Sequence, residues 1–186
     1  MAISYKKYID SAVLLGVELA VIRAVAKVEG NGIGMIEGKP IILYEPHVFF
    51  KQLREINIKP VVSDICYPVW GSKPYPKGQK AQWERLERAI KINRQAALKS
   101  ASWGMFQVMG YNFRSCGCGS LQAFVNAMYE GEDKHLELFI NYIRNEKLDD
   151  ELKNKDWRGF AAQYNGKYYY KNNYDVKLKK AYQLFS

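Results

Sequence analysis

Apolar residues recur at helical spacing over the first part of the chain, and this predicts helices over residues 3–14 and 17–29. In the second helix, Ile22 and Ala26 fall on the same face as Glu29. Three glycines follow between residues 30 and 34 and should end the helix. The pattern therefore places a carboxylate on the apolar face of a helix, at its C-terminal end.

A β-hairpin should come next, because two apolar runs flank "EGK". Its second strand, "PIILYE", is predicted to end at Glu45, and "HVFFKQLREI" predicts a short helix. Residues 57–80 are rich in proline, glycine and aromatic residues, which predicts a long irregular loop. We expect that loop to pack against the body and to line a groove.

The second half of the chain is again helical in pattern. Amphipathic helices are expected over "QWERLERAIKINRQAALKS", "SLQAFVNAMYEG", "EDKHLELFINYIRNE" and "DWRGFAAQYNG", and Asp156 suits the N-cap of the last. The stretch "SWGMFQVM" is short and almost wholly apolar, and it predicts a buried helix. With no linker or repeat, residues 1–186 are expected to form one mostly helical α+β domain with a small hairpin near the N-terminus.

Composition narrows the possible functions. The chain is 48% hydrophobic, which disfavours disorder, and no apolar run approaches the roughly 20 residues of a membrane span. The net charge of +9 favours polyanionic partners, but no nucleic-acid motif accompanies it. The N-terminus lacks a signal-peptide pattern, so synthesis in a cytoplasm is expected. Cys66, Cys116 and Cys118 are expected to be free thiols because their number is odd and the chain should be made in a cytoplasm, and "CGC" lacks the second ligand pair of a zinc site.

Glu29 is the first candidate for chemistry. Desolvation on an apolar face raises the pKa of a carboxyl group, and a raised pKa makes it a proton donor near neutral pH. Glycosidases, lysozyme among them, use such a group to protonate the leaving oxygen of a sugar–sugar bond. The alternative is a Glu at a helix end that simply points into water.

Six segments, taken together, resemble the N-acetylmuramidase family found as the catalytic domain of phage endolysins. They are "AVIRAVAKVEGNGIG", "KPIILYEPHVF", "SASWGMFQVMGYNF", "CGCGSLQAFVNAM", "DWRGFAAQYNG" and "YDVKLKKAY". The resemblance implies a lysozyme-like fold whose hairpin lines the cleft. It also implies cleavage of the bond between N-acetylmuramic acid and N-acetylglucosamine. A single catalytic domain without a separate cell-wall-binding domain is expected.

The resemblance also assigns site residues. Glu29 matches the catalytic glutamate, which would act as general acid. Ser102, Gly104 and Gln107 match a motif shared with goose-type lysozymes and lytic transglycosylases. In that motif the glycine allows close approach to a sugar and the glutamine hydrogen-bonds in the cleft.

Tyr164 and Asn165, in "QYNG", are placed at the cleft by the same resemblance, with Tyr164 near the scissile sugar. From the residues alone, Tyr164 is interpreted as an aromatic core residue and Asn165 as part of an Asn-Gly turn. Tyr111 and Asn112 are equally consistent with cleft and fold roles. Trp70 and Tyr75 could stack on sugars or pack their loop.

A second carboxylate has two candidate positions. Glu45 is assigned as a second catalytic residue, the general base for water, with a structural pairing to His47 or Arg54 as the alternative. Asp64 is a weaker candidate for the same role. His47 and His135 lack metal-ligand spacing, and His135 is expected on a helix surface without a chemical role.

The expected partner is the peptidoglycan glycan strand, reached in the cell wall (periplasm) after synthesis in the host cytoplasm and release with the help of a holin. No metal, organic cofactor, nucleic acid or stable membrane insertion is expected, and the chain should be a monomer. A lytic transglycosylase acting on the same bond, or a non-catalytic peptidoglycan-binding protein, is the alternative.

Overall fold

The computed structural model describes residues 2–30 and 32–186. The helices are α1 (Tyr5–Leu15), α2 (Leu19–Glu29), α3 (Pro46–Glu55), α4 (Gln79–Ile92), α5 (Arg94–Lys99), α6 (Leu121–Met128), α7 (Glu132–Asn145), α8 (Asp149–Lys153), α9 (Trp157–Tyr164) and α10 (Tyr174–Phe185). The strands are β1 (Met35–Ile36), β2 (Lys39–Pro40), β3 (Ile42–Tyr44), β4 (Ala101–Trp103) and β5 (Val108–Met109). Two 3₁₀ helices are η1 (Gly110–Asn112) and η2 (Tyr169–Asn172).

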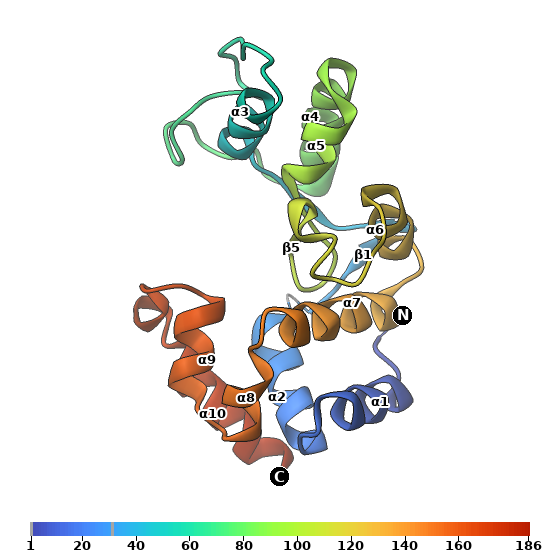
Figure 1. Cartoon of the computed structure of the whole chain (residues 1–186), viewed down its shortest axis with the longest axis vertical. Helices are drawn as coiled ribbons and strands as arrows, with labels where there is room; N and C mark the ends of the chain where they lie inside the picture. Colours follow the sequence, from blue (N-terminus) through green and yellow to red (C-terminus); the bar gives the residue numbers. More distant parts are fainter. Residues whose placement is uncertain (1, 31) are drawn as a thin grey trace.

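The elements form two lobes that meet along α7 (Figure 1). One lobe holds both ends of the chain: α10 packs along α2 and α9, and α1 packs against α2 and α7. The other lobe contains the strands and α3 to α6. One continuous apolar core runs through both lobes. The prediction of a mostly helical α+β fold is confirmed.

The first two helices follow the prediction closely because their caps are encoded locally. The Ser4 hydroxyl accepts a hydrogen bond from the Lys7 amide and caps the start of α1. Gly16, at φ 65°, ends that helix in the left-handed conformation. The second helix, α2, ends at Glu29, so the carboxylate lies at a helix C-terminus as predicted.

The predicted hairpin is present, but its second strand is divided between two sheets. Glu37 and Gly38 both have positive φ and form the two-residue turn between β1 and β2. After Pro40 the chain leaves this pair. The next strand, β3, ends at Tyr44 rather than Glu45 and pairs with β4, which pairs in turn with β5, all antiparallel.

The prediction of a buried helix over "SWGMFQVM" is wrong, because this stretch forms the β4–β5 hairpin. Gly104 and Gln107 have φ of 70° and 49°, values that an α-helix does not contain. The turn carries the buried side chains of Met105 and Phe106. An apolar turn tip that packs into the core gives the same hydrophobic run as a buried helix, which explains the error.

The single helix predicted over residues 82–100 is broken at Asn93. This residue has extended backbone angles, ends α4, and accepts a hydrogen bond from the Ala96 amide at 2.9 Å, so that it caps α5. The predicted cap of α9 is confirmed: Asp156 accepts from the Gly159 amide at 2.9 Å.

His135 is buried in the core, so its predicted place on a helix surface is wrong. Its Nδ1 accepts the Met105 N–H at 3.1 Å, and its Nε2 lies 2.8 Å from the Met128 carbonyl. These partners require the neutral tautomer with the proton on Nε2. Burial lowers the pKa of the imidazole and favours the same neutral form. His135 thus holds the β4–β5 turn against α7.

The three cysteines are free thiols. Within residues 2–30 and 32–186, no helix combines the length and apolar character needed to cross a membrane.

We expect Gly104→Ala to lower thermal stability by several degrees. A Cβ at this site would lie 2.9 Å from His135 Nδ1, and the φ of +70° is unfavourable for any residue with a side chain. Strain of about 1–2 kcal/mol would add to overpacking of about 1–3 kcal/mol.

Gly38→Ala is the matched control, because its φ is +75° but its Cβ would meet open space. Thermal unfolding of both variants isolates the contact with His135. Equal losses in the two variants would show that the close packing on His135 contributes nothing.

Candidate active site

Glu29 lies where α2, α9 and α10 come together. Its Oε2 accepts a hydrogen bond from Asn165 Nδ2 at 3.1 Å. Its Oε1 is buried, and no described residue hydrogen-bonds to it. Asn165 Oδ1 is likewise buried without a partner within the part of the chain that the structure describes. Two polar atoms in the same site are therefore left without protein partners, which is the arrangement expected where a ligand completes the hydrogen bonds.

Burial raises the pKa of Glu29 to about 7, opposed in part by the hydrogen bond from Asn165 and the positive charge of Lys177. The negative end of the α2 dipole further disfavours a carboxylate at this helix end. These surroundings agree with the sequence pattern, which places Glu29 on the apolar face of its helix. A carboxyl group in this state holds a proton up to neutral pH and can donate it.

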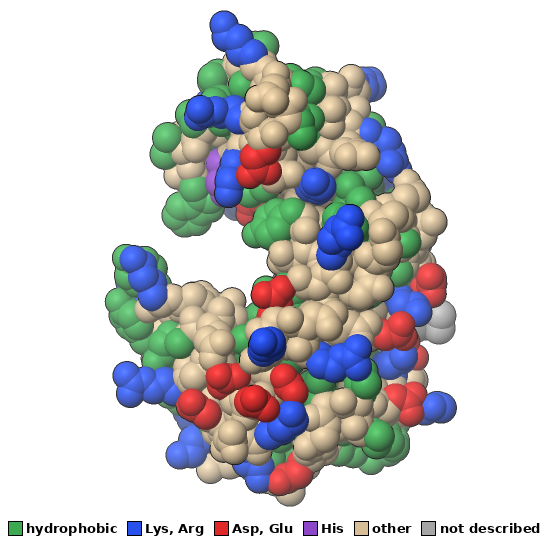
Figure 2. Space-filling view, in the orientation of Figure 1, with side chains coloured by type: hydrophobic (Ala, Val, Ile, Leu, Met, Phe, Trp, Pro, Cys, Tyr) green, Lys and Arg blue, Asp and Glu red, His purple; other side chains and the backbone are tan. Residues whose placement is uncertain are grey.

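A cavity of about 360 Å³ surrounds this carboxyl group. One wall comes from the helical lobe and the other from β5, η1 and the turn before β5. The space-filling view shows a deep notch between the same two lobes (Figure 2). The cavity is lined by Glu29, Phe106, Gln107, Val108, Met109, Tyr111, Asn112, Tyr142, Tyr164, Asn165 and Tyr174. The hairpin that forms its wall is thus β4–β5, whereas β1–β2 does not line it.

Gln107 lines the cavity. Ser102 and Gly104 do not line it, but both hydrogen-bond to the Gln107 side chain. The Ser102 hydroxyl donates to Gln107 Oε1 at 2.8 Å, and Gln107 Nε2 donates to the Gly104 carbonyl at 2.8 Å. Ser102 is buried, and the missing side chain of Gly104 makes room for His135. Direct contact of Ser102 or Gly104 with a sugar stays a prediction, and the structure gives both a role in holding Gln107.

Tyr164 lines the cavity from within a cluster of aromatic rings. Its ring centroid lies 5.4 Å from Phe139, 6.1 Å from Tyr142 and 5.7 Å from Phe160. Burial, followed by the negative charge of Glu29, raises the pKa of Tyr164. The packing fixes the ring next to Glu29, as a residue beside the scissile bond would require.

Glu45 lies outside this cavity, at the start of α3. Its Oε2 accepts a hydrogen bond from the Tyr75 hydroxyl and lies 3.4 Å from His47 Nδ1. The charge of Glu45 adds to burial in raising the pKa of Tyr111, a residue of the cavity wall. Glu45 therefore lies near Tyr111 but outside the cavity lining. Of its two predicted structural partners, His47 is close, and the described residues show no pairing of Glu45 with Arg54.

Asp64 is engaged elsewhere. Both of its carboxylate oxygens accept hydrogen bonds from Arg88 at 2.7 Å, and this pairing lowers the pKa of Asp64. It does not line the cavity around Glu29. Trp70 is 71% exposed and is also absent from that lining, whereas Tyr75 is committed to Glu45.

Tyr142 and Tyr174 complete the aromatic side of the cavity, and neither was predicted from the sequence. Each lies in a helix whose hydrophobic pattern is set mainly by other residues, so the sequence does not single it out. The packing of α7 and α10 around α9 brings both rings close to Glu29. Among the described residues, no three metal-ligating side chains cluster into a metal site.

A desolvated carboxyl group in a cleft between a helical lobe and a small sheet is the arrangement of lysozyme-like glycosidases. The solved structures agree. The chain superposes on the crystal structure of the Burkholderia AP3 phage endolysin with a TM-score of 0.84 and 36% sequence identity, over 97% of this chain and 69% of that chain. No curated protein sequence matches the chain significantly.

The N-acetylmuramidase family matches residues 18–186, and the chain belongs to this family. It is a peptidoglycan hydrolase of the glycosidase type.

We expect Glu29→Gln to be more stable than the wild type above neutral pH. The ordinary pKa of 4.5 applies in the unfolded chain, and the folded protein raises it to about 7. The wild type therefore loses stability as pH rises from about 4.5 to about 7, reaching a loss of up to about 3 kcal/mol. The amide has no charge to bury and avoids this loss.

Chemical unfolding at several pH values measures the difference, with the exposed Glu37→Gln as control. The gap between Glu29→Gln and wild type should widen from pH 4.5 to 7 and then stay constant. A gap that does not change with pH would mean that Glu29 is not desolvated.

Proposed function

We propose that the chain is an endolysin-type muramidase that cleaves the bond between N-acetylmuramic acid and N-acetylglucosamine, with Glu29 as the general acid. The observation that carries this proposal is the half-buried Glu29, whose pKa is raised to about 7 and whose buried Oε1 has no partner among the described residues. Family membership supports the substrate, and the likeness to a phage endolysin supports the biological setting.

In the proposed reaction, the Glu29 carboxyl group donates its proton to the glycosidic oxygen. The bond to the leaving sugar breaks, and positive charge develops at the anomeric carbon. The resulting Glu29 carboxylate is stabilised by Asn165, whose Nδ2 already donates to it. Gln107 and Tyr164 hold the glycan from opposite walls of the cavity.

Water completes the hydrolysis, and we assign its alignment to Glu45. That carboxylate is held by Tyr75 near Tyr111, outside the cavity lining. In inverting enzymes two carboxyl groups leave space between them for water, and this is the arrangement proposed for Glu29 and Glu45.

A lytic transglycosylase is the second candidate, and one observation favours it: Glu29 is the single carboxylate among the described residues that line the cavity. Such an enzyme uses one group as acid and then as base, and it forms an anhydromuramyl end without water. Mass spectrometry of the fragments released from purified peptidoglycan in ¹⁸O-labelled water separates the two. Label at the new reducing end supports the muramidase, and anhydromuramyl ends support the transglycosylase.

The proposed setting is release from the host cytoplasm with the help of a holin, followed by action on the cell wall as a monomer. Action on the wall is what the family does, and the remaining steps rest on the likeness to a phage endolysin.

We expect Glu29→Gln to lower the turnover of purified peptidoglycan by about 10²–10⁴-fold, because the amide cannot supply the proton. For the wild type, activity should fall as pH rises through about 7, the pKa at which Glu29 loses its proton. Dye release from labelled sacculi measures both effects, and Glu130→Gln, at an exposed residue that lines neither cavity, controls for the change in charge. Near-wild-type turnover in Glu29→Gln would exclude this residue as the acid.

For Glu45→Gln, we expect reduced turnover that added azide partly restores, because azide can replace the water that the carboxylate aligns. Tyr75→Phe, which keeps the carboxylate and removes only its hydroxyl partner, should be impaired less, and Asp64→Asn should match the wild type. A loss of thermal stability without rescue by azide would instead make Glu45 a structural partner of Tyr75 and His47. Full activity and unchanged stability would remove it from both roles.

A further inference from the structure

A second hollow, of about 590 Å³, lies between the β1–β2 hairpin and the first turns of α4. Its volume falls within the range of small-molecule binding sites. Gln79 anchors its base: the side-chain amide accepts from the Ile42 N–H at 2.8 Å and donates to the Ile42 carbonyl at 3.1 Å. These two hydrogen bonds fix the start of α4 to β3.

This hollow and the Glu29 cavity both adjoin the β3–β4–β5 sheet, through different residues of β4. Successive residues of β4 point to opposite faces, so Ser102 and Trp103 diverge. Ser102 bonds to Gln107 in the cavity. Trp103 packs against Trp83 of the hollow, with ring centroids 5.8 Å apart and planes at 79°. Among the described residues, none lines both sites.

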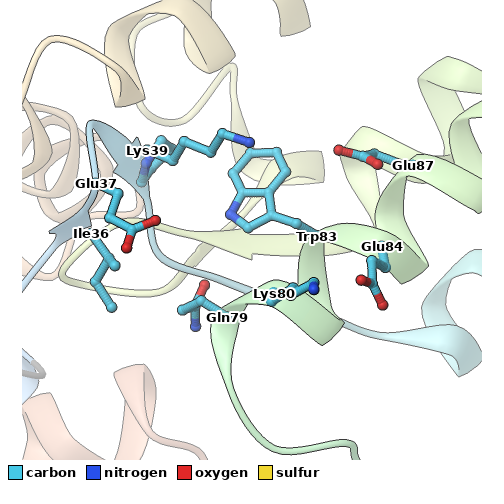
Figure 3. Close-up of a pocket in the computed structure, with 9 residues that line it drawn as sticks. Ile36, Glu37, Lys39, Gln79, Lys80, Trp83, Glu84 and Glu87 are labelled. Atoms are coloured by element: carbon cyan, nitrogen blue, oxygen red, sulfur yellow. The ribbon is translucent and has the colours of Figure 1, made fainter.

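The side chains in the hollow combine an aromatic ring with hydrogen-bonding groups. Figure 3 shows the Trp83 ring projecting into it, with Lys39 beside the ring, Glu37 across the hollow and Glu87 on the helix side. The Lys39 ammonium lies over the Trp83 ring, 5.5 Å from its centroid, so a sugar that stacks on this face must displace the flexible lysine side chain. A half-exposed indole presents a flat apolar surface that matches the C–H face of a pyranose, and the surrounding groups can bond to hydroxyl and acetamido groups.

The local charge argues for a neutral ligand. Glu37, Glu84 and Glu87 outnumber Lys39 and Lys80 in the hollow, although the whole chain carries a net charge of +9. A phosphate backbone would meet these carboxylates, so nucleic acid is disfavoured. An uncharged sugar has no such penalty and uses both the carboxylates and the ammonium as partners.

We propose that this hollow is a non-catalytic binding site for N-acetylated glycan, centred on Trp83. It rests on the proposed function in one respect: the glycan strand of peptidoglycan is the ligand that the enzyme meets. Bound there, a neighbouring strand would hold the enzyme on the insoluble wall between cleavage events.

The direct test is an NMR titration of ¹⁵N-labelled Glu29→Gln protein with an N-acetylglucosamine tetramer, following the indole N–H signals. We expect a saturable shift of the Trp83 signal, with the signal of buried Trp157 as the reference. Assignment uses single Trp→Phe variants. A Trp83 signal that stays fixed while residues of the Glu29 cavity shift would overturn the proposal, and this experiment does not depend on a variant that folds poorly.

Binding to the wall is the second test. Trp83→Ala, made in the Glu29→Gln background, should cosediment with purified sacculi about tenfold less than its parent. Glu87→Ala alters only an exposed side chain of the hollow and should weaken binding in the same direction. The matched control is Trp70→Ala, which removes an exposed indole elsewhere. Equal cosedimentation of parent and Trp83→Ala would overturn the proposal.

Hydrolysis separates this proposal from the proposed function. In the otherwise wild-type enzyme, Trp83→Ala should leave the cleavage of short soluble peptidoglycan fragments unchanged and slow the digestion of sacculi. Wild-type protein that fails to cleave either substrate would refute the proposed function. Normal cleavage of both by Trp83→Ala would refute the glycan site alone.

Discussion

The relative position of the two lobes depends on the contacts of the neutral His135 imidazole. From the buried face of α7 it accepts the Met105 N–H and thereby fixes the turn that carries Gln107. One turn earlier on the same helix, Glu132 accepts the Gly34 N–H at 2.6 Å and fixes the chain that follows Glu29. A Cβ at Gly34 would lie 2.5 Å from His135 Nδ1, so both backbones approach the ring as closely as packing allows. One helix thus sets the separation of the two cavity walls, and protonation of His135 would remove the acceptor that holds one of them.

The Glu29 site stabilises the acid form of its carboxyl group at the expense of folding free energy. Burial and the end of α2 both disfavour the carboxylate, and Asn165 and Lys177 oppose them only in part. The balance places the pKa near neutral, where a general acid is most effective. A stronger counter-charge would have stabilised the fold and removed the proton. With Glu29 as the proposed acid, the site is a compromise in which the demands of the reaction limit stability.

The sequence predicted the parts of this site that local patterns encode. The spacing of α2 placed Glu29 on an apolar face, and the cap at Asp156 located α9, which ends beside Asn165. Prediction from the sequence failed where tertiary packing determines the structure or the burial of a segment. An apolar run does not distinguish a buried helix from the buried turn at Met105, and His135 occupies a helical position whose burial depends on two distant glycines. The resemblance to a family named Ser102 and Gly104, but only the contacts show that they support Gln107 from behind.

The strand alternation of β4 explains how so small a sheet can serve two surfaces. Ser102 bonds to Gln107 of the Glu29 cavity, and Trp103 packs against Trp83 of the hollow, so neighbouring residues contact different sites. A glycan bound at Trp83 need not compete with one beside Glu29, because the described residues that line the two sites are different. Binding and cleavage can therefore be altered independently, since the acid depends on the helical lobe and the indole on α4. In a mesh of strands, two separate sites allow contact with two different strands at once, which raises the effective concentration of substrate at the cavity without any change in the cavity itself.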